Sequence, residues 1–254
     1  MDFARYPSLA GRVVFISGGG SGIGASLVEH FAAQGARVGF VDIQEEASRA
    51  LVDRLAAGAQ HAPVFLKADV TDIPAYQAAI REIGARLGPI TVLINNAARD
   101  DRHTLESVTP EYWDRCVAIN MRHQFFAVQA VIEQMAGAGG GSIITFGSIS
   151  WMRKIGGMVG YTTSKAAING LTRTLARELG PRNIRVNCIV PGAIVTERQM
   201  KLWSTPESEK AMIENQCLKF RLQPAEIARM ALFLAADDSR GCTAANFVVD
   251  AGLS

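Results

Sequence analysis

The residues best suited to acid–base chemistry in this sequence are a tyrosine and a lysine one helical turn apart. Tyr161 and Lys165 fall within a segment of helical periodicity, residues 161–179, so both side chains project from the same face of the expected helix. A free phenol has a pKa of about 10, too high for a good base near neutral pH. An ammonium one turn away favours the phenolate. The pair can therefore supply a general base, and Ser148, just after a predicted strand, can hold the oxygen that loses its proton.

A glycine-rich turn near the N-terminus is suited to binding phosphate. Residues 17–24 read Ser-Gly-Gly-Gly-Ser-Gly-Ile-Gly and stand between a predicted strand and a predicted helix. Glycines let the backbone turn tightly against a pyrophosphate, and the helix N-terminus offers free N–H donors and a favourable dipole. Glycine-rich turns are common, but this place between strand and helix is the one that a dinucleotide-binding turn requires.

Acidic residues end the next two predicted strands. Asp42 can accept hydrogen bonds from both hydroxyls of an adenosine ribose, and its charge repels a 2′-phosphate, so the sequence predicts NAD rather than NADP as cofactor. The alternative for Asp42 is an ordinary solvated carboxylate at a strand end. Asp69, followed by Val70, can bond the adenine amino group; alternatively, Asp69 or the pair Thr71-Asp72 caps the following helix, and both roles are compatible.

Short β-branched runs alternate with longer amphipathic stretches along the whole chain, and several of these runs are continuously apolar, as in strands covered on both faces. This alternation predicts one α/β domain over residues 1–254, a Rossmann fold with a doubly wound parallel sheet of about seven strands and helices on both faces. Residues 192–222 interrupt the rhythm with a helix of their own, an insertion of the kind that shapes a binding site. The predicted strands are 13–17, 37–42, 62–68, 90–95, 142–147, 184–190 and 246–250, and the predicted helices are 22–34, 44–57, 73–87, 111–135, 161–179, 206–218 and 224–235.

The composition excludes several classes of protein. Of the 254 residues, 48% are apolar and 20% are charged, and the net charge is +2, which supports a large core and is too close to neutral for a nucleic-acid or membrane-surface protein. The first seven residues lack the basic and apolar regions of a secretory signal, so we expect a cytoplasmic protein with reduced thiols. No Cys-x-x-Cys pair and no ligand spacing of histidines occurs, so we expect no metal site. The residues concerned are Cys116, Cys188, Cys217, Cys242, His30, His61, His103 and His123.

Several motifs occur together in a fixed order. Asn95-Asn96-Ala97-Ala98 follows the fourth predicted strand, Ser148 the fifth, and Pro191-Gly192 the sixth, with Tyr161-x-x-x-Lys165 between the last two. With the glycine turn, this set resembles the short-chain dehydrogenase/reductase superfamily over essentially the whole chain; it departs from the family at Ala98, where glycine is usual. The resemblance implies a catalytic tetrad of Asn120, Ser148, Tyr161 and Lys165. In it, Asn120 holds a water that passes the proton outward, and Lys165 also bonds the nicotinamide ribose; the alternative for Asn120 is an ordinary polar residue of a helix.

The same resemblance implies an NAD site and a homotetramer. Thr196, five residues past Pro191, is similar to the family's contact to the nicotinamide carboxamide. The family usually forms tetramers through two long helices, here 111–135 and 161–179, and through the C-terminal strand region. The first helix has more apolar surface than one sheet face needs, from Phe125, Phe126, Val128 and Val131. The residues expected to contact NAD are Gly18, Ser21, Gly22, Ile23, Gly24, Asp42, Ile43, Asp69, Val70, Asn96, Ala97, Tyr161, Lys165, Pro191, Gly192, Ile194 and Thr196.

A closer resemblance, in segments 6–9, 100–103, 146–151, 216–219 and 250–252, is to bacterial aldose 1-dehydrogenases, a group that includes D-xylose, L-arabinose and D-galactose dehydrogenases. It implies oxidation of the C1 hydroxyl of a cyclic pentose or hexose to the aldonolactone, with Tyr161 as base. For Trp151 and Trp203 the alternative is lid packing or a subunit contact, and for Arg102 and His103 it is a loop clamp or an interface ion pair. The residues expected to contact the sugar are Ser148, Ser150, Trp151, Tyr161, Gln199 and Arg102.

Two other functions share the general motifs. A 3-oxoacyl-carrier-protein-type reductase, or another short-chain alcohol dehydrogenase, would carry the same tetrad, but such reductases usually take NADP and have basic residues near the glycine turn. Asp42 and the neutral turn oppose a 2′-phosphate. A redox-silent nucleotide-binding regulator is a third class, and the intact Ser148, Tyr161 and Lys165 oppose it because a sensor need not keep a base.

Overall fold

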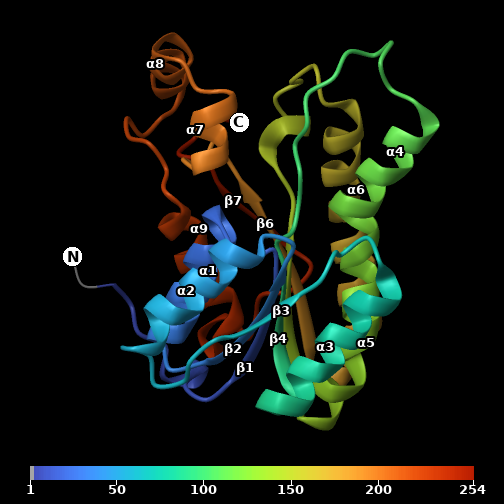
Figure 1. Cartoon of the computed structure of the whole chain (residues 1–254), viewed down its shortest axis with the longest axis vertical. Helices are drawn as coiled ribbons and strands as arrows, with labels where there is room; N and C mark the ends of the chain where they lie inside the picture. The colour runs from blue at the N-terminus through green and yellow to red at the C-terminus, as the bar shows by residue number, and fades with distance from the viewer. Residues whose placement is uncertain (1–2) are drawn as a thin grey trace.

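Seven parallel strands form the centre of the computed structural model, which describes residues 3–254 (Figure 1). Met1 and Asp2, the first residues of the predicted domain, lie outside the described residues. The strands follow the order β3-β2-β1-β4-β5-β6-β7, which confirms the predicted doubly wound parallel sheet. The strands are β1 (Val13–Ser17), β2 (Arg37–Asp42), β3 (Val64–Lys67), β4 (Ile90–Asn95), β5 (Gly141–Phe146), β6 (Ile184–Pro191) and β7 (Asn246–Val249).

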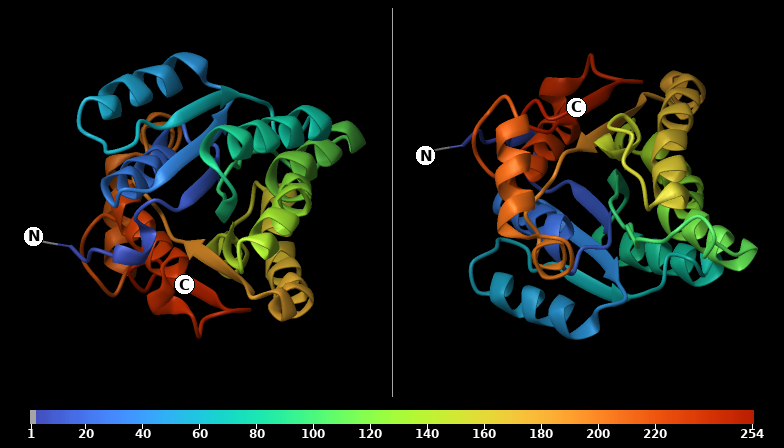
Figure 2. Two further views of the ribbon diagram at one scale, coloured as in Figure 1. Left: turned by 90° about the horizontal axis from the view of Figure 1, so that it is seen from below. Right: turned by 90° about the horizontal axis from the view of Figure 1, so that it is seen from above.

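Helices cover both faces of this sheet (Figure 2). Helices α1, α2 and α9 pack on one face, and α3, α5 and α6 pack on the other. The α/β class predicted from the alternating pattern is therefore confirmed. The helices are α1 (Gly22–Ala33), α2 (Glu45–Ala56), α3 (Ile73–Leu87), α4 (Pro110–Val117), α5 (His123–Gly137), α6 (Val159–Leu179), α7 (Glu197–Leu202), α8 (Pro206–Asn215) and α9 (Pro224–Ala235).

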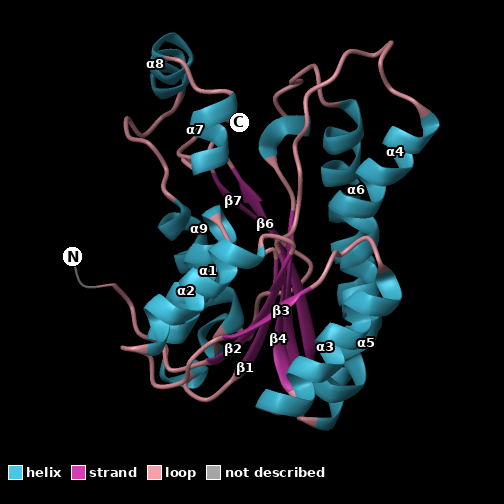
Figure 3. Cartoon of the chain, viewed as in Figure 1, coloured by secondary structure: helices cyan, strands magenta, loops and turns pink. Residues whose placement is uncertain are grey.

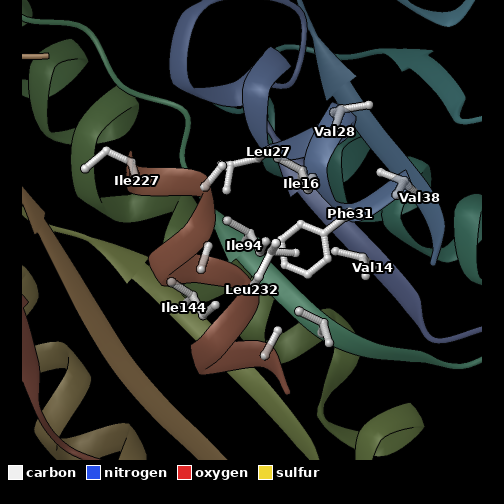
Figure 4. Close-up of a cluster of buried hydrophobic side chains, with 14 of the residues drawn as sticks. Val14, Ile16, Leu27, Val28, Phe31, Val38, Ile94, Ile144, Ile227 and Leu232 are labelled. Carbon is white, nitrogen blue, oxygen red and sulfur yellow. The ribbon is translucent and has the colours of Figure 1, made fainter. Parts of the chain in front are cut away.

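The core has one layer on each side of the sheet because successive residues of a strand point to opposite faces. Val14 and Ile16 of β1 join the layer under α1 and α9, whereas Phe15 between them joins the layer under α3, α5 and α6. Figure 4 shows the first layer, in which Phe31 of α1 and Leu232 of α9 meet over the sheet. All five residues of β1 are buried, which explains why the sequence of this strand does not alternate.

Two elements differ from the predicted ones. The expected single helix over residues 111–135 is interrupted between α4 and α5 by a π-helical turn, Ala118–Arg122, which contains Asn120. Such turns insert a residue into a helix and occur frequently at functional sites. The insertion over residues 192–222 contains two helices instead of one, because α7 precedes α8. With only six residues, α7 is too short to show helical periodicity in the sequence.

Other boundaries move by one to three residues. Strand β3 is shorter than the predicted segment 62–68, and α8 ends before the predicted residue 218 because the chain becomes extended at Gln216. No helix within residues 3–254 is long and apolar enough to cross a membrane.

The strand order reverses on the two sides of β1, and open α/β sheets bind their ligands in the crevice at such a point. From β1 the chain continues to β2 on one side, whereas β4 lies on the other side, so the loops that follow β1 and β4 leave the sheet in opposite directions. Ser17 and Asn95, the last residues of these strands, are paired. The glycine turn and the Asn-Asn-Ala-Ala segment are thereby brought side by side. Helices α7 and α8 and the long loops lie beyond the same edge of the sheet (Figure 3).

Candidate active site

The glycine turn between β1 and α1 is wound too tightly for side chains. Gly18 and Gly22 have φ angles of +68° and +54°, which favour glycine. A Cβ atom on Gly24 would lie 1.7 Å from the carbonyl oxygen of Gly18, and one on Gly18 would lie 2.9 Å from the Cα of Ala97. Asn96 Nδ2 donates to the same Gly18 carbonyl at 2.9 Å. The turn thus presents bare backbone at the N-terminus of α1, a surface that suits a pyrophosphate.

Asp42 lies buried at the carboxyl end of β2, beside this turn. One carboxylate oxygen accepts the N–H of Gly20 at 2.8 Å, and the other accepts the N–H of Gln44 at 2.9 Å. These bonds fix the carboxylate and leave lone pairs for further donors. Gln44 Nε2 in turn donates to the hydroxyl of Ser21, and Ile43 is exposed beside Asp42. Asp42 is therefore held at the glycine turn and is not a freely solvated residue.

The carboxylates after β3 shape a turn and a helix cap. Asp69 accepts the N–H and the hydroxyl of Thr71, each at 2.8 Å. Asp72 caps α3 by accepting the N–H of Ala75 at 3.1 Å. Of the two capping alternatives, Asp72 is the helix cap. Val70, next to Asp69, is buried.

Ser148, Tyr161 and Lys165 come together where β5 and α6 meet. Lys165 is buried, its Nζ donates to the carbonyl of Phe146 at 2.8 Å, and it lies 5.7 Å from the centre of the Tyr161 ring. Burial lowers the pKa of Lys165 to about 8. Burial also raises the pKa of Tyr161 to about 12, against the opposing effect of a hydrogen bond with Ser148. The site thus holds a protonated phenol, a nearby ammonium and a hydroxyl, the components of a general acid–base centre.

Asn120 ties the π-helical turn to the loop after β4. Its Oδ1 accepts the N–H of Arg99 at 2.8 Å, and its Nδ2 donates to the carbonyl of Cys116 at 3.0 Å. Its backbone carbonyl accepts Gln124 Nε2 at 3.2 Å. The buried side chain therefore holds the loop in place, a contact that the sequence did not indicate.

The segment after β6 returns to the start of α1. Thr196 caps α7 by accepting the N–H of Gln199 at 3.2 Å, and its methyl group would lie 3.2 Å from a Cβ atom on Gly22. Gly192 packs against Asp250, where a Cβ atom would approach the Asp250 Cα to 2.6 Å. Ile194 is buried. Segments far apart in the sequence, 18–24 and 192–196, therefore border one crevice.

Two of the expected substrate residues, Gln199 and Arg102, lie on a bridge across the mouth of this crevice. Gln199 Nε2 donates to Asp100 at 2.7 Å, and the Arg102 guanidinium lies 5.1 Å from the centre of the Trp203 ring. Arg198 pairs with the same Asp100 at 3.3 Å. Arg198 could not be predicted from the sequence, because no spacing rule links charges almost 100 residues apart.

Apart from Tyr161 in α6, the remaining expected substrate residues lie in the loop after β5. Ser148 Oγ accepts the N–H of Ser150 at 3.2 Å, and the buried Ser150 hydroxyl has no hydrogen-bond partner among the described residues. Trp151 lines a recess of about 220 Å³ together with Thr162, Thr163 and Ala166. Ser150 lines the same recess. On the helix, Thr163 projects opposite Tyr161, and Thr162 and Ala166 project between the two faces. Trp151 therefore contacts the outer flank of α6 rather than the flank that carries the phenol.

Two histidines hold the walls of the site. His103 Nε2 accepts the N–H of Val159 at 3.1 Å, and its Nδ1 lies 2.9 Å from the hydroxyl of Tyr112, so its contacts are those of a loop clamp. His123 is fully buried, with Nε2 3.1 Å from the carbonyl oxygen of Ala97. Burial lowers the pKa of His123 to about 3, so this imidazole is neutral. The one feature of the sequence that points to His123 is its position three residues after Asn120.

Neither the second recess nor the potential metal ligands of the described residues form another candidate site. A recess of about 490 Å³ between α3 and α5 lies at the amino end of the sheet and is lined by none of the candidate residues. Within residues 3–254, no three His, Cys, Asp or Glu side chains gather in the way that a metal site requires. In the same part of the chain all four cysteines are unpaired.

Two solved structures share this fold over nearly the whole chain. A 7α-hydroxysteroid dehydrogenase, complexed with NADH and 7-oxo glycochenodeoxycholic acid, has 32% identity and a TM-score of 0.92, covering 99% of this chain and 98% of its own. A blue fluorescent protein from a metagenomic library, in complex with NADPH, has 35% identity and a TM-score of 0.89, covering 97% of this chain and 99% of its own.

Sequence comparison gives closer relatives. The probable galactose dehydrogenase of Rhizobium meliloti is 51% identical over 98% of both chains, and the D-xylose 1-dehydrogenase of Caulobacter vibrioides is 50% identical over 99% of both. A sequence model of the family described as enoyl-(acyl carrier protein) reductase matches residues 18–254. With the NAD(P)-binding fold, these matches show that the chain belongs to the short-chain dehydrogenase/reductase family of oxidoreductases.

Proposed function

We propose that this protein is an NAD-dependent aldose 1-dehydrogenase. It oxidises the C1 hydroxyl of a cyclic pentose or hexose, such as D-xylose, L-arabinose or D-galactose, to the aldonolactone. The observation that carries the proposal is the identity of about half of all residues, over the full length, with a D-xylose 1-dehydrogenase and a probable galactose dehydrogenase. Relatives named for other substrates, such as a hydroxysteroid dehydrogenase at 37%, are more distant.

The crevice beside the glycine turn fits a dinucleotide, because side chains on Gly18 or Gly24 would fill the cradle that a pyrophosphate needs. When bound, the nicotinamide accepts the hydride from the sugar. The fixed carboxylate of Asp42 favours NAD, since it can accept the ribose hydroxyls and repels a 2′-phosphate. The other residues proposed to hold the cofactor are Ser21, Gly22, Ile23, Ile43, Asp69, Val70, Asn96, Ala97, Tyr161, Lys165, Pro191, Gly192, Ile194 and Thr196.

Tyr161 is the proposed base. A hydride can leave C1 only as the C1 hydroxyl loses its proton, so the phenolate must lie beside that hydroxyl. Ser148, whose hydroxyl lowers the pKa of the phenol, is the proposed partner of the same oxygen. The Lys165 ammonium favours the phenolate form. Asn120 completes the proposed tetrad beside a water that carries the proton outward.

The remaining hydroxyl groups of the sugar need polar partners on the walls of the crevice. Gln199, whose Oε1 is left as an acceptor by its bond to Asp100, and Arg102 are proposed partners from the bridge, and Ser150, whose hydroxyl is unpartnered, is the proposed partner from the loop after β5. Trp151, which is exposed at the outer edge of this loop, is the remaining proposed sugar contact. A site built on hydroxyl contacts should reject analogues that lack them, because its polar groups would stay unpaired.

The proposal includes assembly into a homotetramer and a location in the cytoplasm. The half-exposed Phe125 on α5 suits burial in a homotetramer with closed symmetry. Four unpaired cysteines suit the reducing cytoplasm.

The test is the rate of NADH formation on a panel of free aldoses, a steroid alcohol and a 3-hydroxyacyl thioester, for the unaltered enzyme and for Tyr161→Phe. We expect turnover with at least one aldose and a loss of about a hundred- to ten-thousandfold in the variant, because it lacks only the phenol oxygen. NADH binding, followed by fluorescence, controls for the fold of the variant and should be retained. Turnover of the steroid or thioester with no aldose oxidised would contradict the substrate class, and a nearly fully active variant would contradict the base.

A further inference from the structure

The loop after β4 and helix α7 are joined by charges across the mouth of the crevice. Arg198 lies at the centre of this bridge, with Nε 3.3 Å from Asp100 and Nη2 2.9 Å from Asp101. Gln199 adds a bond to Asp100 at 2.7 Å, and Arg99 pairs with Asp101 at 2.7 Å. Because several charges share partners, this network is stronger than an isolated surface pair.

Each end of the bridge is anchored in the framework of the site. On the β4 side, the backbone of Arg99 is held by Asn120, and His103 is clamped to the start of α6. On the α7 side, Thr196 begins the helix against the start of α1. The bridge therefore joins two anchored segments, and losing it removes the side-chain contacts that hold α7 against the loop after β4.

The bridge lies next to the reacting groups. Asp100 is close enough to Tyr161 for its negative charge to raise the phenol pKa, and Arg102 is close enough to lower it. The Asp100 side chain is only 16% exposed, so its charge is poorly screened and needs a nearby partner. The Arg102 guanidinium packs over Trp203, which adds a cation–π contact between the same two segments.

We propose that Arg198 is a positioning residue that holds α7 closed against the loop after β4 and so fixes the walls of the substrate space. It does so through Asp100 and Asp101, without itself touching the reacting atoms. If only the closed form binds substrate well, the apparent affinity for substrate falls in proportion to the closed fraction. The expected change in KM for aldoses rests on the proposed function, whereas the ion pairs of the bridge do not depend on the identity of the substrate.

The first test compares Arg198→Ala with Arg182→Ala, in which a surface ion pair with Glu133, remote from the site, is lost. We expect Arg198→Ala to raise the KM for the best aldose about three- to tenfold and to change kcat less than about twofold, whereas Arg182→Ala changes neither. Added salt should raise the KM of the unaltered enzyme and leave that of Arg198→Ala almost unchanged, because only the former has the bridge to screen. Equal KM values and equal salt dependence in all three proteins would overturn the proposal.

The second test needs no turnover. Amide hydrogen exchange in residues 197–203 should accelerate at least about threefold in Arg198→Ala and stay unchanged in Arg182→Ala. A double-mutant cycle of Arg198→Ala with Asp101→Ala should show less than additive effects on this rate, since both variants break one network. If no aldose is oxidised, the proposed function is wrong, but the exchange rate in residues 197–203 still tests whether Arg198 holds α7 in place. If aldoses are oxidised and exchange is unchanged, the bridge alone fails.

Discussion

Replacing the buried lysine beside Tyr161 by an apolar side chain of similar length, Lys165→Met, should slow sugar oxidation mainly at neutral pH. The ammonium lies 5.7 Å from the centre of the phenol ring. With the phenolate charge placed at the ring centre and an effective dielectric constant of about 20, the ammonium stabilises the phenolate by about 3 kcal/mol, or about two pKa units. Burial already raises the pKa of Tyr161 to about 12, so a further rise removes most of the remaining phenolate. We therefore expect kcat to fall about a hundredfold at neutral pH.

The assay is kcat for the best aldose at saturating NAD, followed from neutral to alkaline pH in both proteins. Because the pKa of Lys165 is lowered to about 8, the unaltered enzyme itself loses this charge above that pH, and the difference between the two profiles should narrow there. The thermal midpoint and the far-UV circular dichroism of the variant control for a damaged fold. Profiles that coincide at neutral pH, or a deficit that stays constant at all pH values, would refute the electrostatic reasoning.

Three further predictions concern the cofactor, acid stability and the backbone. The unaltered enzyme should prefer NAD to NADP by more than about tenfold in kcat/KM, and Asp42→Ala should narrow that ratio; equal use of both cofactors by the unaltered enzyme would contradict the role of the carboxylate. Burial lowers the pKa of His123 from 6.5 to about 3, so unfolding takes up a proton below pH 6.5 and stability falls as the pH drops, by about 2 kcal/mol between pH 6.5 and pH 5. His123→Gln should flatten that slope in urea titrations, and an unchanged slope would exclude His123 as its source. Ala251 has a φ of +58°, a left-handed conformation that costs a non-glycine residue about 1–2 kcal/mol. The variant Ala251→Gly removes this cost but gives the unfolded chain more conformational entropy. We therefore expect the variant to be more stable by about 0.5–1 kcal/mol. A lower thermal midpoint in that variant would contradict this assignment of strain.

The sheet and most helices were predictable because their signals are local. A strand such as β1 is a continuous apolar run, and the glycine turn that follows it is a contiguous motif whose geometry is set by positive φ angles. The spacing of Tyr161 and Lys165 likewise fixes their common helix face. The π-helical turn at Asn120 was missed because apolar periodicity runs through it, and one inserted residue leaves no compositional trace.

The walls of the substrate space were only partly predictable. The sequence indicated that the loop 100–103 and the insertion face the crevice, but their mutual contact depends on the tertiary fold. Arg198 meets Asp100 because α7 starts beside α1, and nothing local in either segment encodes that approach. The position of Trp151 beside α6 is a second example, because Trp151 lies in a short 3₁₀ helix, Ile149–Trp151, whose orientation depends on tertiary packing.

The central claim is that the bond broken is the C–H bond at C1 of an aldose. The most direct measurement uses the preferred aldose carrying deuterium at C1, with NAD, and follows the label by mass spectrometry of the reduced cofactor and the sugar product. The proposed function predicts deuterium in the reduced cofactor and none in the resulting lactone, with a slower chemical step than for the unlabelled sugar. Retention of the deuterium in the oxidised sugar would show that another carbon is oxidised and would contradict the account.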